Sequence, residues 1–183
     1  MLAEGMKRLF IALALVGSAG LATLAAQRIL TNPADQYLKR LFPQAAAFSA
    51  FGGTPLHYKA YSVDPKTNPS APPIGLVFWT TDLVPEEHGY HGPIHIIVGL
   101  DMTGIITGAF VDYQSEPYGY FSVEPPEFAA QFKGKSVRAP FKVGEDVHAV
   151  SRATISITSG TRAVRDSVRT MAKLFLNPAS VKN

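Results

Sequence analysis

A run of hydroxyl side chains between residues 150 and 159 is the part of this sequence best suited to chemistry. The run stands directly before segment 160–176, whose apolar residues recur at helical spacing. A hydroxyl-rich turn before a helix suits an anion such as phosphate, because the first N–H groups lack helical partners and the helix dipole is positive there. The same pattern also fits an ordinary cap, in which Ser156, Thr158 or Ser159 accepts a hydrogen bond from those N–H groups.

Other side chains capable of catalysis or metal binding do not form a recognisable site. His88, His91 and His95 are spaced three and four apart, but the glycines and proline between them prevent a regular helix. The chain contains no cysteine, which excludes disulfides and thiolate metal ligands. Nucleophile-elbow, phosphate-loop and dinucleotide-binding glycine patterns are also missing from the sequence. We therefore expect no catalytic residues and no metal site, and no conversion of a substrate by this chain alone.

The hydroxyl run must be positioned by the helices and strands around it. Their expected arrangement predicts an α+β fold, with an antiparallel sheet flanked by helices. The expected strands are 56–63, 74–80, 94–100 and 105–113, and the last two form a hairpin that turns at Gly104. The expected helices are a first helix in 32–50, which Pro43 kinks or ends, a short helix from Pro125 to Phe132, and the helix of 160–176. Residues 136–143 are expected to be extended, and 144–158 to be a polar connection.

The N-terminus predicts a membrane anchor or a signal segment. Lys7 and Arg8 precede an uncharged run, residues 9–26. As a helix, at ~1.5 Å per residue, this run is about 27 Å long and barely spans a hydrocarbon core of about 30 Å. Small residues near its end also fit a cleaved signal peptide. In both interpretations the rest of the chain is exported, because the basic residues favour a cytoplasmic N-terminus.

Composition and these boundaries suggest three parts. They are an anchor or signal in 1–30, a juxtamembrane helix, strand and proline-rich loop in 31–73, and a domain in 74–178. The net charge is +3, but the basic residues are scattered, which argues against nucleic-acid binding. Arg162, Arg165, Arg169 and Lys173 form a basic stripe on the last helix, which we interpret as a solvated face or as a surface for an acidic partner or lipid.

Five segments, in this order, carry a resemblance to a known family. They are Gly89 to Ile94, the hairpin Val98 to Gly108, the pair Glu116-Pro117, Phe128 to Ser136, and His148-Ala149-Val150-Ser151-Arg152-Ala153-Thr154. Together they resemble the FMN-binding domain family, which includes flavoprotein subunits of the sodium-pumping NADH:quinone oxidoreductase and of the Rnf complex, and the extracytoplasmic domain of the nitrous-oxide-reductase accessory regulator. The last segment resembles the family's Asp-x-x-Ser-Gly-Ala-Thr motif, with Arg152 in place of Gly and His148 in place of Asp.

The resemblance implies a cofactor, FMN, joined by a flavin transferase through a phosphoester to the hydroxyl of Thr154. The cofactor-binding residues that it indicates are Ser151, Arg152, Ala153, Thr154, Glu116, Tyr118 and His148. Aromatic residues such as Tyr90, Tyr118, Tyr120 and Phe121 either stack on the flavin ring or take part in ordinary core or loop packing. Glu116 is expected to bind the ribityl chain or nearby backbone, or to be a solvated carboxylate.

The implied role is an electron relay in the periplasm, held by a single-pass anchor in a bacterial inner membrane, with a membrane redox protein or complex as partner. The replacements at Arg152 and His148 leave a second hypothesis open. In it, the chain is a cofactor-free sensory or assembly protein that retains the fold.

Overall fold

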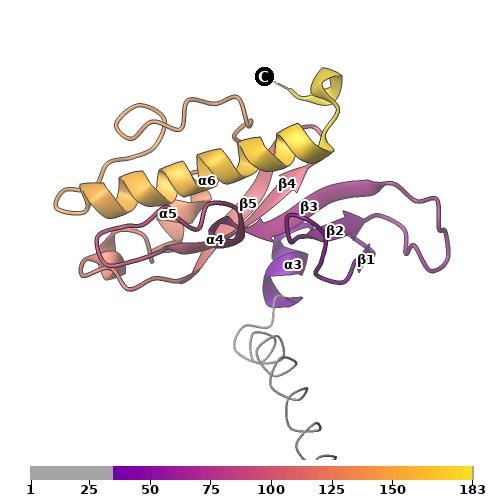
Figure 1. Ribbon diagram of the computed structural model, residues 1–183, viewed down its shortest axis with the longest axis horizontal. Coiled ribbons are helices and arrows are strands. Elements are labelled where there is room, and N and C mark those ends of the chain that lie inside the picture. Colours follow the sequence, from indigo (N-terminus) through magenta and orange to yellow (C-terminus); the bar gives the residue numbers. More distant parts are fainter. Residues whose placement is uncertain (1–34, 183) are drawn as a thin grey trace, which may run out of the picture. The chain divides into compact units, whose positions relative to one another are not determined.

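The protein is described by a computed structural model that places residues 35–182. Its helices are α3 (Asp35–Leu41), α4 (Thr80–Leu83), α5 (Pro126–Ala130) and α6 (Thr154–Phe175), with 3-10 turns η1 (Gly119–Phe121) and η2 (Pro178–Ser180). Its strands are β1 (Ala47–Phe48), β2 (Tyr58–Tyr61), β3 (Pro73–Trp79), β4 (His95–Asp101) and β5 (Ile106–Tyr113). Figure 1 shows these elements in chain order.

The strands form one antiparallel five-stranded sheet in the order β1-β2-β3-β4-β5. Neighbours in the sheet are therefore neighbours in the chain, as expected for antiparallel strands with short connections. The β4–β5 hairpin turns at Gly104, whose φ of +80° is a conformation that glycine adopts without a steric penalty. The predicted hairpin and the α+β class are confirmed.

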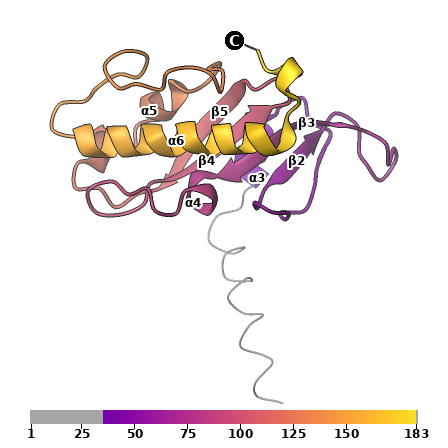
Figure 2. The ribbon, with the colours of Figure 1, turned by 45° about the horizontal axis from the view of Figure 1, so that its top comes forward.

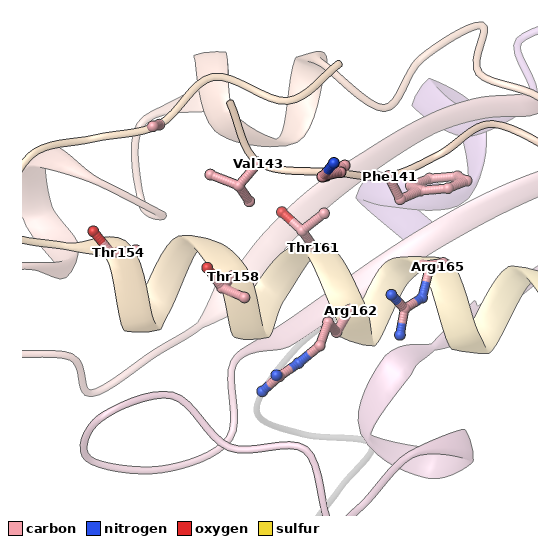
Figure 3. Close-up of a pocket in the computed structure, with 9 residues that line it drawn as sticks. Phe141, Val143, Thr154, Thr158, Thr161, Arg162 and Arg165 are labelled. Carbon is pink, nitrogen blue, oxygen red and sulfur yellow. The ribbon is translucent and has the colours of Figure 1, made fainter. Parts of the chain in front are cut away.

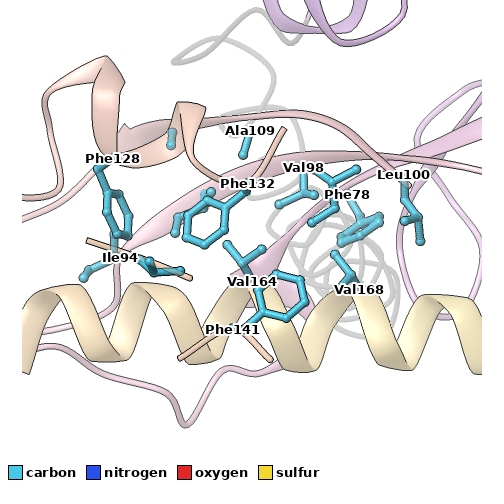
Figure 4. Packing of buried hydrophobic residues seen from close by; sticks show 14 of the residues in the cluster. Phe78, Ile94, Val98, Leu100, Ala109, Phe128, Phe132, Phe141, Val164 and Val168 are labelled. Carbon is cyan, nitrogen blue, oxygen red and sulfur yellow. The ribbon is translucent and has the colours of Figure 1, made fainter. Parts of the chain in front are cut away.

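Helix α6 lies along one face of this sheet and covers the main core (Figures 1 and 2). Phe78, Val98 and Leu100 point from the strands toward Val164 and Val168 of α6 (Figure 4), and all five side chains are fully buried. The apolar residues of α6 recur every three or four positions, which places them on one face of the helix. Burying this face against the sheet is what holds a 22-residue helix in place.

The opposite face of the sheet is covered by the end of α3 and the turn that follows it. Leu41 and Phe42 are buried there. A Cβ placed on Gly75 of β3 would lie 2.1 Å from Cζ of Phe42 and 2.8 Å from the carbonyl oxygen of Leu100. Glycine at position 75 therefore lets the Phe42 ring contact the strand backbone. Because both faces of β4 are covered, its sequence is apolar almost without interruption.

The N-terminal elements differ in extent from the sequence prediction. The helix expected within 32–50 covers only Asp35–Leu41 among the described residues, and residues 47–48 pair with 60–61 as strand β1. The helix ends two residues before Pro43, because proline disfavours helical backbone in the residue before it. The strand expected over 56–63 is limited to Tyr58–Tyr61 and contains a register shift at Ala60/Tyr61.

The C-terminal elements contain the larger errors of prediction. Helix α6 begins at Thr154, not at residue 160, so most of the hydroxyl run, from Thr154 to Ser159, lies inside the helix. Serine and threonine are weak helix formers. In this helix, however, Ile157 is fully buried, and the hydroxyl of Thr161 donates a hydrogen bond to the carbonyl of Ile157 at 2.7 Å. Tertiary packing overrides the local preference. Residues 136–143 were expected to be extended, but they form no strand and make only isolated bridges.

None of the helices within residues 35–182 is long and apolar enough to cross a membrane. The span predicted at 9–26 lies outside the described residues. From residue 35 onward the chain forms one compact unit, and its sheet takes strands from both sides of residue 73. The division of the chain at residues 30 and 73 stays a prediction.

Candidate functional site

Thr154 is the first residue of α6, and its position is set by a sharp turn in the backbone. The N–H group of Ala153 donates a hydrogen bond to the carbonyl of Val150 at 3.1 Å, which closes the turn. Within that turn Arg152 has a φ of +70°, in the left-handed region that glycine adopts most easily. Ala153 is buried and anchors the turn, whereas Thr154 is exposed. The Thr154 hydroxyl is therefore presented outward at the positive end of a long helix.

Beside Thr154 runs a groove of about 400 Å³ between α6 and the loop 141–149. From the helix, this groove is lined by Thr154, Thr158, Thr161, Arg162 and Arg165. From the loop it is lined by Phe141, Lys142, Val143 and Ala149. Figure 3 shows the three threonines following one another along α6, with Phe141 and Val143 on the other side. The volume lies in the range of about 300–1,000 Å³ that small-molecule pockets occupy.

The basic residues of the groove are held by acidic residues. The guanidinium of Arg162 donates to Oε1 of Glu87 from Nη2 at 2.7 Å and from Nε at 3.1 Å. Arg165 forms a two-bond pair with Asp166, at 2.7 and 2.9 Å. The hydrogen bonds to Asp166 raise the pKa of Arg165, although partial burial opposes the shift, and the charges of Asp166 and Glu87 raise it further. Arg165 is therefore always charged, and both guanidinium groups have restrained positions.

The loop on the far side of the groove is folded around Asp146. Its carboxylate accepts hydrogen bonds from the N–H groups of Lys142, at 2.6 Å, and Phe141, at 3.2 Å, and pairs with the ammonium group of Lys135 at 3.0 Å. Burial alone would raise the pKa of Asp146, but these hydrogen bonds and the charge of Lys135 together lower it. Asp146 thus stays ionised and holds the groove wall in place.

Glu116 fastens the first turn of α6 to a distant loop. Its carboxylate accepts a short hydrogen bond from the hydroxyl of Ser156, and bonds from the N–H groups of Tyr90 at 2.8 Å and His91 at 2.9 Å. Burial would raise the pKa of Glu116, but the bonds from Ser156 and from the loop N–H groups, including that of Gly92, outweigh it and lower the pKa. A buried carboxylate is thereby kept charged beside a helix N-terminus, where the helix dipole favours it.

This arrangement can be compared with known families. The family model described as an FMN-binding domain matches residues 89–169. Residues 89–169 are therefore similar to the FMN-binding domain family. A search of curated proteins finds no match. The match covers the loop bound by Glu116, the hairpin, the groove wall and α6 as far as Arg169, so the resemblance seen in the sequence is confirmed.

The site has groups that fit the parts of FMN. A phosphate bound to Thr154 would meet the N-terminal N–H groups of α6, and within the described chain no side-chain hydrogen bond caps this end. The groove adjoining Thr154 offers the hydroxyls of Thr154 and Thr158 on one side and the apolar groups of Val143 and Ala149 on the other, whereas Phe141 and Thr161 are almost fully buried. An isoalloxazine ring, which has flat apolar faces and a polar edge, matches such a mixed lining.

The predicted cofactor residues do not all lie in this groove. Thr154 lines it, and Ser151, Arg152 and Ala153 form the turn that leads to it. His148 is exposed, and its backbone N–H donates to Oε1 of Gln131 at 2.7 Å. The remaining two predicted residues lie apart from the groove: the carboxylate of Glu116 is engaged as described above, and Tyr118 is half exposed with its ring 5.6 Å from that of Phe121. Whether they contact a cofactor stays a prediction.

Sequence reasoning missed most of the residues that line the groove. Thr158, Thr161, Arg162 and Arg165 follow Thr154 at intervals of four, seven, eight and eleven residues, which is one face of a helix. That signal was readable, but only if the helix had been placed from residue 154. The loop residues carried no such signal, because the folding of 141–149 around Asp146 depends on Lys135, outside that loop.

Proposed function

We propose that this protein is a flavin carrier that relays electrons through FMN attached by a phosphoester to Thr154. The observation that carries the proposal is the exposed Thr154 hydroxyl at the first residue of α6, beside a groove of about 400 Å³. The match of residues 89–169 to the FMN-binding domain family supports the choice of cofactor.

The attachment is a phosphoryl transfer to Thr154, carried out by a flavin transferase. The Oγ atom of Thr154 forms a bond to the phosphorus of an FMN donor in which the phosphate is activated as an anhydride. The anhydride bond breaks, the nucleotide monophosphate leaves, and the threonine proton passes to a base of the transferase. The helix N-terminus lowers the energy of the resulting phosphodiester anion. The exposure of Thr154 gives a second protein access to the hydroxyl.

Once attached, the cofactor supplies the redox chemistry, and the protein orients it. A covalent bond suits a compartment in which free flavin is dilute, because the cofactor cannot be lost by dissociation. We further propose that the domain lies on the periplasmic side of a bacterial inner membrane, tethered by residues 9–26, and exchanges electrons with a membrane redox protein. The charges before residue 9 and the apolar character of 9–26 support this part of the proposal.

Mass spectrometry of protein coexpressed with a flavin transferase tests the attachment. We expect an FMN-sized adduct on wild-type protein, none on Thr154→Ala, and a full adduct on Thr158→Ala. Thr158 is a matched control because it is a threonine in the same groove, one turn further along the helix.

An adduct that persists in Thr154→Ala would place the bond elsewhere. Colourless wild-type protein without an adduct, expressed with sufficient flavin, would refute the flavin role and favour the cofactor-free sensory or assembly protein. Yellow protein that loses its colour on denaturation and filtration would refute the covalent bond while keeping FMN.

A further inference from the structure

The sheet face opposite α6 carries a row of aromatic side chains. Trp79, Ile97 and Phe110 are paired neighbours on β3, β4 and β5, so their side chains point to the same side of the sheet. Phe78 points toward α6, and the alternation of side chains along a strand therefore turns Trp79 toward the α3 side. Tyr58 of β2 joins the row, because its ring centroid lies 6.2 Å from that of Trp79. Figure 1 shows α3 and α6 on opposite sides of the sheet.

Two more aromatic rings extend this row at its ends. The ring of Phe51 lies 4.8 Å from that of Tyr58 and 5.3 Å from that of Trp79. At the other end, the ring of Tyr37 in α3 lies 5.5 Å from that of Phe110. We call these five side chains, Tyr37, Phe51, Tyr58, Trp79 and Phe110, the aromatic band. Each of them is only partly buried, so the band contacts the surroundings of the domain as well as its interior.

Basic side chains stand beside the aromatic band. The Cζ atom of Arg40 lies 4.0 Å from the ring centroid of Phe110, and Arg40 and Lys39 are both exposed. The indole N–H of Trp79 donates a hydrogen bond to Oδ2 of Asp112 at 2.8 Å, which fixes the orientation of the ring. Tryptophan and tyrosine are enriched where a membrane meets water, and long basic side chains there reach the lipid headgroups. The composition of this face therefore matches a membrane–water interface.

The aromatic band is also close, along the chain, to the predicted membrane span. Eight residues, 27–34, separate the apolar run 9–26 from Asp35, the first residue of α3. Even a fully extended chain of this length, at ~3.3–3.6 Å per residue, reaches only about 30 Å. A span at 9–26 therefore keeps the start of α3 near the lipid. Tyr37 is the third residue of α3, so the band lies at the part of the domain that this short connection holds.

We infer that the aromatic band, together with Lys39 and Arg40, lies against the anionic lipid headgroups of the membrane that tethers the chain. The inference rests on the proposed tether at residues 9–26 and is independent of the attachment at Thr154. Because α6 lies on the other face of the sheet, this orientation turns Thr154 toward the water (Figure 2). A flavin transferase then reaches Thr154 from the aqueous side, and a membrane redox partner must extend beyond the sheet to meet a cofactor there.

The fluorescence of Trp79 tests this inference directly, because the chain contains one tryptophan. Full-length protein, expressed without a flavin transferase so that no flavin quenches the emission, is reconstituted into vesicles of phosphatidylcholine and phosphatidylglycerol. The acyl chains carry bromine near the headgroup in one set of vesicles and none in the other, and bromine quenches only tryptophan that it contacts. We expect Trp79 to lose most of its emission in the brominated vesicles.

A variant that moves the tryptophan to α6 is the matched control. Trp79→Phe combined with Leu174→Trp places the indole at an exposed position on the opposite side of the sheet. This variant should keep its emission in brominated vesicles, and circular dichroism checks that it is folded.

Charge variants measure the part played by the two cations. Lys39→Gln combined with Arg40→Gln should lower the ratio of docked to undocked domain, taken from the quenched fraction of the Trp79 emission, by roughly fivefold for each charge removed. Raising the salt to 1 M should act in the same direction. Lys133→Gln combined with Lys173→Gln removes two exposed charges outside the band and should leave the ratio unchanged.

Quenching of Trp79 in wild-type protein, with an unquenched Leu174→Trp control, supports the inference. Vesicle-bound protein whose Trp79 emission is unaffected by bromine overturns it, and a blue shift in that case would show that protein, such as a second copy of the chain, covers the band instead. Equal quenching of both proteins also overturns it, because the domain then has no preferred face toward the lipid. An unchanged ratio in Lys39→Gln/Arg40→Gln overturns the role of the two cations.

Failure of the proposed tether gives a different result. Protein that does not float with the vesicles overturns the tether at 9–26, and this inference falls with it. The attachment at Thr154 is unaffected by that result, because mass spectrometry tests it separately.

Discussion

Replacing Arg152 with glycine is expected to stabilise the folded protein. The backbone of Arg152 has a φ of +70°, in the left-handed region, and this costs a residue with a Cβ about 1–2 kcal/mol. Glycine removes that cost but gains conformational freedom in the unfolded chain, which opposes folding by roughly 0.5–1 kcal/mol. The difference is a net stabilisation of about 0.5–1 kcal/mol, equivalent to roughly 1–4 °C in Tm for a domain of this size.

Urea denaturation followed by circular dichroism measures this change, and an unchanged m value would show that the two proteins unfold in the same way. Ser151→Gly is the matched control. Ser151 is the neighbouring exposed residue and is not among the residues of positive φ, so glycine there should destabilise the protein by about 0.5–1 kcal/mol.

Opposite signs at two adjacent positions would tie the effect to backbone conformation. A loss of stability in Arg152→Gly would refute the reasoning, because it would show that the arginine side chain contributes more than the strain costs. Arg152→Ala keeps the Cβ and removes the side chain, so it isolates that contribution. We also expect Arg152→Gly to accept FMN at Thr154 at least as fully as wild type.

The remaining predictions concern the carboxylate of Glu116, the contact of Phe42 with Gly75, and the groove ion pair. Glu116→Gln should destabilise the protein by about 1–3 kcal/mol at pH 7, since it weakens three hydrogen bonds to a buried charge. Because folding lowers the pKa of Glu116 below its ordinary value of 4.5, the wild-type advantage in urea melts should be full above that pH and disappear as the pH falls through the folded value. Gly75→Ala should cost about 1–3 kcal/mol in thermal melts, since its Cβ would overlap the Phe42 ring, and Gly52→Ala, whose Cβ meets nothing within 4 Å, should cost less than half as much. Arg162→Gln should change the unfolding free energy in urea melts by no more than about 1 kcal/mol, because its ion pair with Glu87 is solvent-exposed.

Local pattern was a good guide to the sheet and a poor guide to the start of α6. The β4–β5 hairpin was readable because two β-prone runs flank a short turn ending in glycine, and this signal lies within a few residues. The start of α6 was not readable from propensity, since Ser156 and Thr158 suggest a cap or a turn. Their helical state depends on the burial of Ile157 and on Glu116, forty positions earlier in the chain.

The site was predicted only in part, because part of it depends on contacts between residues far apart in the chain. The resemblance identified Thr154 and the turn before it, and the replacement of glycine by Arg152 correctly marked a backbone position with special requirements. The other side of the groove comes from loop 141–149, whose shape depends on contacts to Lys135 and to α6. Nothing in the local pattern of that loop encodes those contacts, so the groove required the three-dimensional structure.

The three hydrogen bonds accepted by the Glu116 carboxylate restrict how this protein can evolve. Three stretches of chain, around residues 90, 116 and 156, meet at one carboxylate. If a descendant sequence replaced Glu116, the hydroxyl of Ser156 and the N–H groups of Tyr90 and His91 would lose their acceptor. A substitution at position 116 should therefore be accompanied by one at position 156 or by a different loop conformation near residue 90. Among aligned relatives, these positions are expected to vary together or not at all.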